Sequence, residues 1–202
     1  EYSPSLQNGH TPIVIDNGSF QCRAGWMSDE KPSLVFRNAV AKSRGKKDGE
    51  MEILIGNDIA NIELVRWSLR SQFDRDVVTH YDAQEQIFDH IFSRLGINTQ
   101  GSVDHPVVLT ECVCNPNYSR QSMNELLFEC YRVPQVTYGI DSLFSLYYNQ
   151  PMRENNNALV ISSGYQVSHI LPVVNGKLDA RSCKRINVGG NQCIGYMQKL
   201  LQ

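Results

Sequence analysis

The chain has 202 residues, of which 41% are hydrophobic and 20% are charged, and its formal net charge is −2. This composition excludes a disordered tail and is typical of a soluble globular protein of one or two domains. The small charge excludes a general attraction to nucleic acid or anionic membranes, so such binding would need a local patch. The sequence has no signal-peptide pattern and no apolar run of membrane-spanning length, and we expect an intracellular protein without membrane contact.

A predicted hairpin over residues 12–26 is the first motif of the chain. An apolar β-branched run ends at Asp16, a tight turn follows over Asn17, Gly18 and Ser19, and a second extended run completes the motif. Backbone N–H groups of such a turn can hold phosphate oxygens, and the Asp16 carboxylate can order the water shell of Mg²⁺. The motif indicates a site for an anion and a metal ion. The alternative is an ordinary surface hairpin, because Asn-Gly is a common hairpin turn.

Residues 157–172 repeat this layout. An apolar strand is followed by Ser162 and Ser163, by Gly164 and then by a returning strand. Two phosphate-type hairpins in one chain suggest a clamp that closes on a nucleotide from two sides. The alternative is two unrelated hairpins of a β-rich domain.

Basic residues crowd into the segment 41–51, between short predicted strands over 33–36 and 53–56. The four cations are Lys42, Arg44, Lys46 and Lys47. They indicate either a solvated loop or a contact with a nucleic-acid backbone or an acidic partner surface.

Two helices are predicted next. A short one covers residues 57–64, and a longer one begins at Asp82, which forms a capping-box pattern with Glu85, and ends at Gly96. The apolar stripe of the longer helix consists of Ile87, Phe88, Ile91, Phe92 and Leu95. His90 lies off this stripe, so we expect it at the surface or at the boundary of the core.

Strands and helices then alternate. Residues 106–110 indicate a strand covered on both faces, and residues 135–138 a second strand. Between them, Ser119 is expected to cap a helix that stops before Pro134. The apolar stripe of that helix consists of Met123, Leu126, Leu127 and Cys130. Together with a helix over 141–148, this order predicts an α/β architecture of mixed sheets flanked by helices.

A polar loop over residues 153–157 separates two structural units. Beyond it, residues 170–180 form a predicted hairpin around a primed Asn175-Gly176 turn. The pair Gly189-Gly190 opens a helix whose start either binds an anion or is simply capped. The predicted domains are a polar N-terminal segment over 1–11, a first domain over 12–152 with a small outer subdomain near 37–76, and an incomplete second domain over 153–202.

The chain has six cysteines and no C-x-x-C pair. Because the paired spacing of a zinc site is missing, we expect reduced and mostly buried thiols, as in the cytosol or nucleus. The first residue is not Met and the last residues continue a helical pattern, so we expect a fragment.

Several stretches together resemble the first half of actin. They are residues 13–19, residues 105–111 with Asn115-Pro116, residues 142–147, and Gly164 with His169. The resemblance implies the actin/Hsp70/sugar-kinase (ribonuclease H-like) fold, in which two related domains close on ATP or ADP with a divalent ion such as Mg²⁺. This chain would supply the first domain and the start of the second.

The resemblance also carries over nucleotide-contacting positions. In the first hairpin they are Asp16, Asn17, Gly18, Ser19, Phe20 and Arg23, and in the second they are Ser163, Gly164, Tyr165 and Gln166. Asp16 would lie on the metal side. Phe20 stands where actin has glycine, and Arg23 stands where actin has a phosphate-contacting lysine, which keeps the charge and changes its geometry.

The second hairpin departs further from actin. Ser162 replaces the metal-side aspartate, and Tyr165 and Gln166 replace an Asp-Gly pair. Asp141 replaces a glutamine that helps to position the attacking water. His169 stays where the family orients water, but without its partners it is not assigned a catalytic role. We therefore expect no catalytic residue in this chain.

These departures are similar to those of actin-related proteins that do not form filaments. Residues 119–121 and 185–190 resemble, within that group, the nuclear subunits of Ino-eighty type chromatin remodellers. The resemblance implies a nuclear subunit that couples a separate motor ATPase to the nucleosome, in contact with DNA, histones, other remodeller subunits and a small partner subunit. The alternatives are a weak ATPase of the same fold, with Asp141 or His169 as base, and a polymerising cytoskeletal actin.

Overall fold

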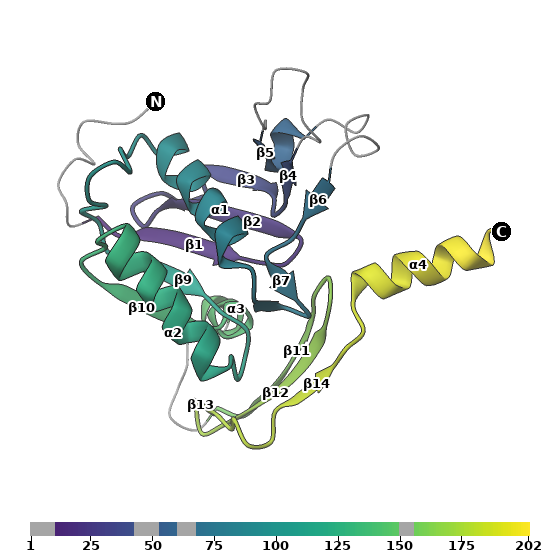
Figure 1. Cartoon of the computed structure of the whole chain (residues 1–202). Coiled ribbons are helices and arrows are strands. Elements are labelled where there is room, and N and C mark those ends of the chain that lie inside the picture. The colour runs from purple at the N-terminus through teal and green to yellow at the C-terminus, as the bar shows by residue number, and fades with distance from the viewer. Residues whose placement is uncertain (1–10, 43–52, 60–67, 150–155) are drawn as a thin grey trace. The chain divides into compact units, whose positions relative to one another are not determined.

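The computed structural model describes residues 11–42, 53–59, 68–149 and 156–202 (Figure 1). These residues form two compact units, which are considered separately below. The described residues of the first unit lie within Glu1–Asp74, Val78–Thr110 and Pro116–Tyr138, and those of the second lie within Arg75–Val77, Glu111–Asn115 and Gly139–Gln202. The helix after residue 140 is grouped with the second unit. The predicted domain bounds of 12–152 and 153–202 remain predictions.

A five-stranded sheet is the centre of the first unit, with the order β10-β9-β1-β2-β3. Its strands are β1 (Ile13–Asn17), β2 (Gln21–Trp26), β3 (Leu34–Arg37), β9 (Val107–Thr110) and β10 (Val136–Gly139). β1, β2 and β3 form the predicted antiparallel meander, and β9 runs parallel to β1. In β9, Val107 and Leu109 are buried and Val108 is only half-buried, so one face of that strand is covered less than predicted.

Helix α1 (Tyr81–Arg94) lies over this sheet (Figure 1), and its apolar stripe packs into the same core as Ile13 and Ile15. Phe88 and Phe92 are fully buried, and His90 is half-buried at the boundary, as predicted. The predicted capping box is wrong. The N-cap residue is His80, without a side-chain capping bond, because the chain enters the helix ahead of Asp82. Asp82 instead lies in the first turn, where its charge complements the helix dipole.

Helix α2 (Asn117–Glu125) continues into a π-helical turn, η4 (Leu126–Cys130). Its N-cap is Pro116, so the prediction that Ser119 caps it is wrong; the buried Ser119 hydroxyl donates to the Val78 carbonyl oxygen at 3.1 Å. The wider π turn interrupts the 3.6-residue period. Cys130 consequently faces solvent instead of continuing the buried stripe.

Smaller elements complete the first unit. Strands β5 (Ile53–Ile55), β4 (Val40–Lys42) and β6 (Ser68–Arg70) form a three-stranded sheet, and β7 (Phe73–Asp74) pairs with β8 (Val77–Val78). Where a helix was predicted over 57–64, the chain makes only a 3₁₀ turn, η2 (Gly56–Asp58), and Ile59 is already extended. The rest of that predicted helix lies outside the described residues.

The second unit is built on an antiparallel sheet. Its elements are α3 (Asp141–Asn149), β11 (Ala158–Ser163), β12 (Ser168–Val174), β13 (Lys177–Leu178), β14 (Lys184–Ile186) and α4 (Gly190–Leu200). β12 pairs with β11, β13 and β14. Asn175 and Gly176 have φ values of 50° and 74°, which confirms the predicted primed turn.

The prediction of mostly buried thiols is wrong. All six cysteines are free, and only Cys22 is buried. Three of the others are exposed, among them Cys130 through the π turn and Cys193 on α4, none of whose residues is buried. Burial raises the pKa of the Cys22 thiol far above its usual value, and the nearby Asp16 raises it further. Cys22 is therefore an inert core residue.

Within the described ranges, no helix combines the length and apolar character needed to cross a bilayer.

Candidate functional site

The first hairpin joins β1 to β2 through residues 18–20, with Asp16 opposite Arg23 and Asn17 opposite Cys22. Gly18 does not have a left-handed φ, in contrast to Gly176 in the two-residue Asn-Gly turn. Gly18 is required for space instead. A Cβ atom there would lie 2.8 Å from the carbonyl oxygen of Gln21. The glycine thus allows a close approach between two parts of the turn's own backbone.

Hydrogen bonds from two sides hold the Asp16 carboxylate. Arg23 Nη1 donates to Oδ2 at 2.9 Å, and Thr110 Oγ1 donates to Oδ1 at 3.1 Å. The Thr110 oxygen in turn accepts from the backbone N–H of Asn17 at 2.9 Å. A carboxylate offers about four acceptor positions, so the Asp16 oxygens can still bind metal-bound water. The donor set of carboxylate and hydroxyl oxygens suits Mg²⁺.

The other residues of the first hairpin differ in how far their side chains are exposed. Asn17 and Ser19 are buried, whereas the Phe20 side chain is 48% exposed. The Asn17 amide donates to Gln84 Oε1 at 2.9 Å and accepts from Asn38 Nδ2 at 2.8 Å. The turn is therefore fixed from its buried side.

The second hairpin joins β11 to β12, with Ser162 opposite His169 and Ser163 opposite Ser168. The two hydroxyl oxygens of Ser163 and Ser168 are 3.2 Å apart, and the Gly164 N–H donates to the Val167 carbonyl oxygen at 2.9 Å. Ser163 and Gly164 are exposed. No carboxylate lies at the position of Ser162, so this hairpin lacks the acidic group that the first one has in Asp16.

The start of α4 closes the turn of the second hairpin. The Gly190 N–H donates to the Gly164 carbonyl oxygen at 3.0 Å, and the Asn191 N–H donates to the Tyr165 carbonyl oxygen at 2.8 Å. The Gly189 N–H donates to Gln192 Oε1 at 2.9 Å. Three N–H groups at this helix start are thus already paired. This favours the interpretation of a capped helix start over that of an anion-binding site.

Asp141 and Gln166 stand at positions that contribute to the actin site, and here both accept hydrogen bonds from main-chain N–H groups. The Asp141 carboxylate accepts from the Ser142 N–H at 2.6 Å at the start of α3. Gln166 Oε1 accepts from the Asp76 N–H at 2.9 Å. Burial lowers the pKa of His169, Asp76 and Asp141 act to raise it, and Arg185 acts to lower it. Within the described part of the chain, the buried His169 Nε2 has no hydrogen-bond partner.

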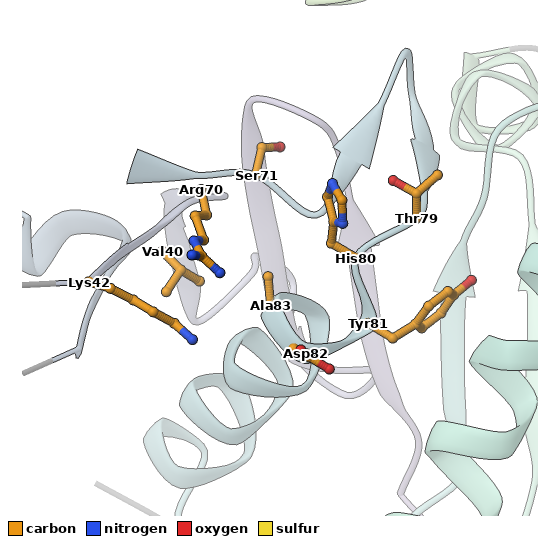
Figure 2. A pocket seen from close by; sticks show the side chains of 9 residues that line it. All are labelled: Val40, Lys42, Arg70, Ser71, Thr79, His80, Tyr81, Asp82 and Ala83. Carbon is orange, nitrogen blue, oxygen red and sulfur yellow. The ribbon is translucent and has the colours of Figure 1, made fainter. Parts of the chain in front are cut away.

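Of the four cations predicted to contact nucleic acid or a partner, the structure describes only Lys42; Arg44, Lys46 and Lys47 lie outside the described residues. Lys42 lines a cavity of about 500 Å³ (Figure 2), whose other lining residues are Val40, Arg70, Ser71, Thr79, His80, Tyr81, Asp82 and Ala83. The side chains of Lys42 and Arg70 lie on the same side of this cavity in Figure 2. Lys42 and Arg70 are thus two cationic side chains that line one cavity.

Four residues that hold the first hairpin were missed from the sequence: Asn38, Gln72, Gln84 and Thr110. For Gln84 a signal exists. It lies three and four residues before Ile87 and Phe88, so it occupies the apolar stripe of α1 and is fully buried. Asn38 and Gln72 lie in connecting segments, where polar residues are ordinary and give no such signal.

The structure brings together the predicted residues of each hairpin, the first within the first unit and the second within the second unit. Their roles in binding nucleotide remain predictions. So does the contact predicted for the basic segment.

Comparison with known proteins identifies the family. The family model described as Actin matches residues 7–202. The chain is 57% identical to "Actin-related protein 5" of Gallus gallus over 197 residues, and 54% identical to the protein of the same name from Homo sapiens over 196 residues. Each match covers 95% of this chain and 32% of the relative. The Saccharomyces cerevisiae protein of that name is 39% identical over 197 residues, which cover 98% of this chain and 26% of the relative.

The chain thus spans about a third of the length of the chicken and human relatives. The family match covers nearly the whole chain, and the mixed α/β architecture agrees with the first domain of the actin fold. The resemblance seen in the sequence is confirmed, and the chain belongs to the actin family.

Proposed function

We propose that this chain is part of a nuclear, non-filamentous actin-related subunit of a chromatin-remodelling complex. In this role it couples a separate motor ATPase to the nucleosome. Nucleotide bound at the first hairpin acts as a structural ligand and is not turned over. The sequence resemblance to remodeller subunits and the relatives named actin-related protein 5 support the proposal.

The observation that carries the proposal is the unequal condition of the two hairpins. The first keeps an oriented carboxylate in Asp16, a cation in Arg23 and a glycine turn. In the second, Ser162 supplies no charge, and the carbonyl oxygens of Gly164 and Tyr165 accept hydrogen bonds from the start of α4. One hairpin suits a nucleotide phosphate with Mg²⁺, while the other lacks the groups for hydrolysis.

The fit of ATP or ADP with Mg²⁺ rests on the first hairpin alone. Asp16 would order the water around the ion, and the turn at Gly18 and Ser19 would approach the phosphates through its backbone. The bound nucleotide would supply negative charge and a metal ion, and so would stabilise the fold by mass action.

The coupling role predicts a contact with nucleosomal DNA through the basic segment. Lys42 and Arg70 both line the cavity in Figure 2, together with the acidic Asp82, so the described end of this segment shares the cavity with a second cation. Phosphate contacts by such groups release counterions and make the affinity depend on salt.

The experiment measures nucleosome affinity of the remodelling complex reconstituted with the full-length subunit. In the test variant, Lys42, Arg44, Lys46 and Lys47 are all replaced by Ala. In the matched control, the exposed Lys177, Arg181, Lys184 and Lys199 are replaced, which removes the same charge. We expect the test variant to bind more weakly and to lose about 0.9 from the salt slope for each phosphate contact removed. Equal affinity of the two variants at low salt would contradict the contact.

Polymerisation is tested separately. We expect the full-length protein to stay unassembled when salt is added, as measured by sedimentation. Salt-induced filaments would support a cytoskeletal actin in place of a remodeller subunit.

A further inference from the structure

Four buried amide side chains in the first unit are joined head to tail. Gln72 Nε2 donates to Asn38 Oδ1 at 2.6 Å, Asn38 Nδ2 donates to Asn17 Oδ1 at 2.8 Å, and Asn17 Nδ2 donates to Gln84 Oε1 at 2.9 Å. Gln72 and Gln84 are fully buried, and Asn38 and Asn17 are 2% and 8% exposed. We call these four residues the amide chain.

The amide chain connects four separate segments of the sequence around Asn17. Asn17 ends β1, Asn38 lies between β3 and β4, Gln72 lies between β6 and β7, and Gln84 lies in α1. The connections into and out of the small three-stranded sheet therefore each contribute one amide. All of these bonds lead to Asn17, the residue at which the first hairpin turns.

The amide chain also holds the backbone of the turn. Asn38 Nδ2 makes a second bond, to the Gly18 carbonyl oxygen at 2.9 Å, and the Asn38 N–H donates to the Phe20 carbonyl oxygen at 2.9 Å. With the Thr110 bond to the Asn17 N–H, the turn is fixed at three backbone positions, Asn17, Gly18 and Phe20, which flank Ser19. Such bonds restrict the conformations of the turn without using its outward surface.

A gain in the free energy of unfolding does not explain why the amide chain is present. A typical hydrogen bond contributes only about 1 kcal/mol net, and a buried polar atom without a partner costs about 1–3 kcal/mol. Both ends of the chain carry such atoms, because Gln72 Oε1 and Gln84 Nε2 have no partner within the described residues. A buried network of this kind specifies one arrangement of the groups it joins more than it strengthens the core.

We infer that Asn38, Gln72 and Gln84 are positioning residues of the first hairpin. They hold Asn17 and Gly18 in the single conformation that receives a nucleotide phosphate. This inference rests on the proposed nucleotide binding, but the positioning itself can be measured without ligand.

The test uses the full-length protein and the substitution Gln84→Met, which keeps the length of the side chain and removes the acceptor of the Asn17 amide. We expect faster amide hydrogen exchange at Asn17, whose N–H donates to Thr110 Oγ1, and at Asn38, whose N–H donates to the Phe20 carbonyl oxygen. The increase should be at least about tenfold in the ligand-free protein, through local opening. The Kd for Mg-ATP should rise by about tenfold for the same reason. Exchange in β11 and β12 should not change.

The matched control is Gln86→Met, the same substitution two residues further along α1, at a side chain outside the amide chain. It should leave exchange at Asn17 and Asn38 and the Kd for Mg-ATP unchanged. A purely structural role of Gln84 predicts that exchange rises across the whole unit through global unfolding, and that outcome would overturn the inference. So would unchanged exchange at Asn17 and Asn38 in Gln84→Met.

A second variant, Asn38→Ala, removes both side-chain bonds to the turn and should raise exchange there further. If the unsubstituted protein binds no Mg-ATP, the proposed nucleotide ligand is wrong, while the exchange rates of the ligand-free protein still decide the positioning role.

Discussion

The two hairpins share a sequence layout and differ in what holds them. In the first, the polar side chains Asn17 and Ser19 point into the protein and are buried. In the second, Ser163 and Gly164 are exposed, and main-chain bonds from the start of α4 hold the turn. The first turn is thus fixed mainly by buried side chains, whereas the second is fixed by main-chain groups at the start of α4.

This difference teaches that a repeated pattern of strand, small polar pair and glycine does not by itself make two equal phosphate sites. A turn held from its buried side keeps its outward backbone for a ligand. In the second turn the Gly164 N–H, the kind of group that binds a phosphate oxygen, already donates to the Val167 carbonyl oxygen, and Ser162 supplies no carboxylate. The four predictions below test this contrast, beginning with the largest expected effect.

The contact between α4 and the second turn requires glycine at position 189. A Cβ atom there would lie 2.6 Å from the carbonyl oxygens of both Gly164 and Tyr165. We expect Gly189→Ala to lower the free energy of unfolding of the second unit by about 3 kcal/mol, the upper range for overpacking. Thermal unfolding and exchange at Gly190 measure the effect.

The control for this prediction is Gly195→Ala in the same helix, where an added Cβ would meet no atom within 4 Å. It should be neutral or stabilise by up to about 1 kcal/mol, because alanine is the better helix former. A similar loss of stability in both variants would mean that α4 is sensitive throughout, and that its start has no special contact.

The turn glycines themselves should differ in tolerance. A Cβ atom at Gly18 would lie 2.8 Å from the Gln21 carbonyl oxygen, while one at Gly164 would lie 3.1 Å from the Val167 carbonyl oxygen. We expect Gly18→Ala to cost about 2 kcal/mol of unfolding free energy and Gly164→Ala about 1 kcal/mol, measured by denaturant unfolding of each variant. The reverse order would contradict the tighter and more rigid packing of the first turn.

Acid should affect the second hairpin through His169. Burial lowers the pKa of this residue below the value of 6.5 that applies when it is unfolded. Between the two pKa values the unfolded chain binds more protons, so the free energy of unfolding falls as the pH drops below 6.5 and levels off below the folded pKa. One such histidine gives a slope of at most about 1.4 kcal/mol per pH unit.

The variant His169→Gln should reduce that slope, as measured by denaturant unfolding between neutral and mildly acidic pH. Burial also lowers the pKa of His90, which lies in the first unit, so His90→Gln is a matched comparison. If His169→Gln left the slope unchanged, the neutral imidazole would not contribute to the stability of the second hairpin.

The smallest effect on stability is expected at the ion pair of the first hairpin. Arg23 and Asp16 are 49% and 30% exposed, and exposed pairs contribute about 0.2–1 kcal/mol. Asp16→Asn should therefore hardly change the unfolding midpoint, yet it should weaken Mg-ATP binding because the carboxylate is lost. Ser162→Asn, the same residue introduced in the second hairpin, should leave binding unchanged. A large loss of stability in Asp16→Asn would assign the carboxylate to the fold rather than to a ligand.

Much of the fold could be predicted because it follows from periodic apolar patterns. The apolar β-branched run that ends at Asp16, the stripe of α1 and the Asn175-Gly176 turn each have a local signal, and the structure agrees with each. Helix starts were predicted less well. Asp82 and Ser119 are good capping residues by type, but neighbouring residues occupy the N-cap positions.

The candidate site, too, could be predicted only in part. The hairpins themselves were visible in the sequence, whereas their supports were not. The amide chain joins residues 17, 38, 72 and 84, and the second turn meets α4 through main-chain groups that leave no mark on the sequence except Gly189. Contacts between segments far apart in the chain need the fold before they can be seen.

The most direct test of the contrast between the hairpins is the state of the nucleotide held by the purified full-length protein. The account predicts that Mg-ATP binds, that it is recovered unhydrolysed after denaturation, and that Asp16→Ala loses it. Steady conversion of ATP to ADP at a rate abolished by His169→Ala would show that the second hairpin takes part in catalysis, and would contradict the account.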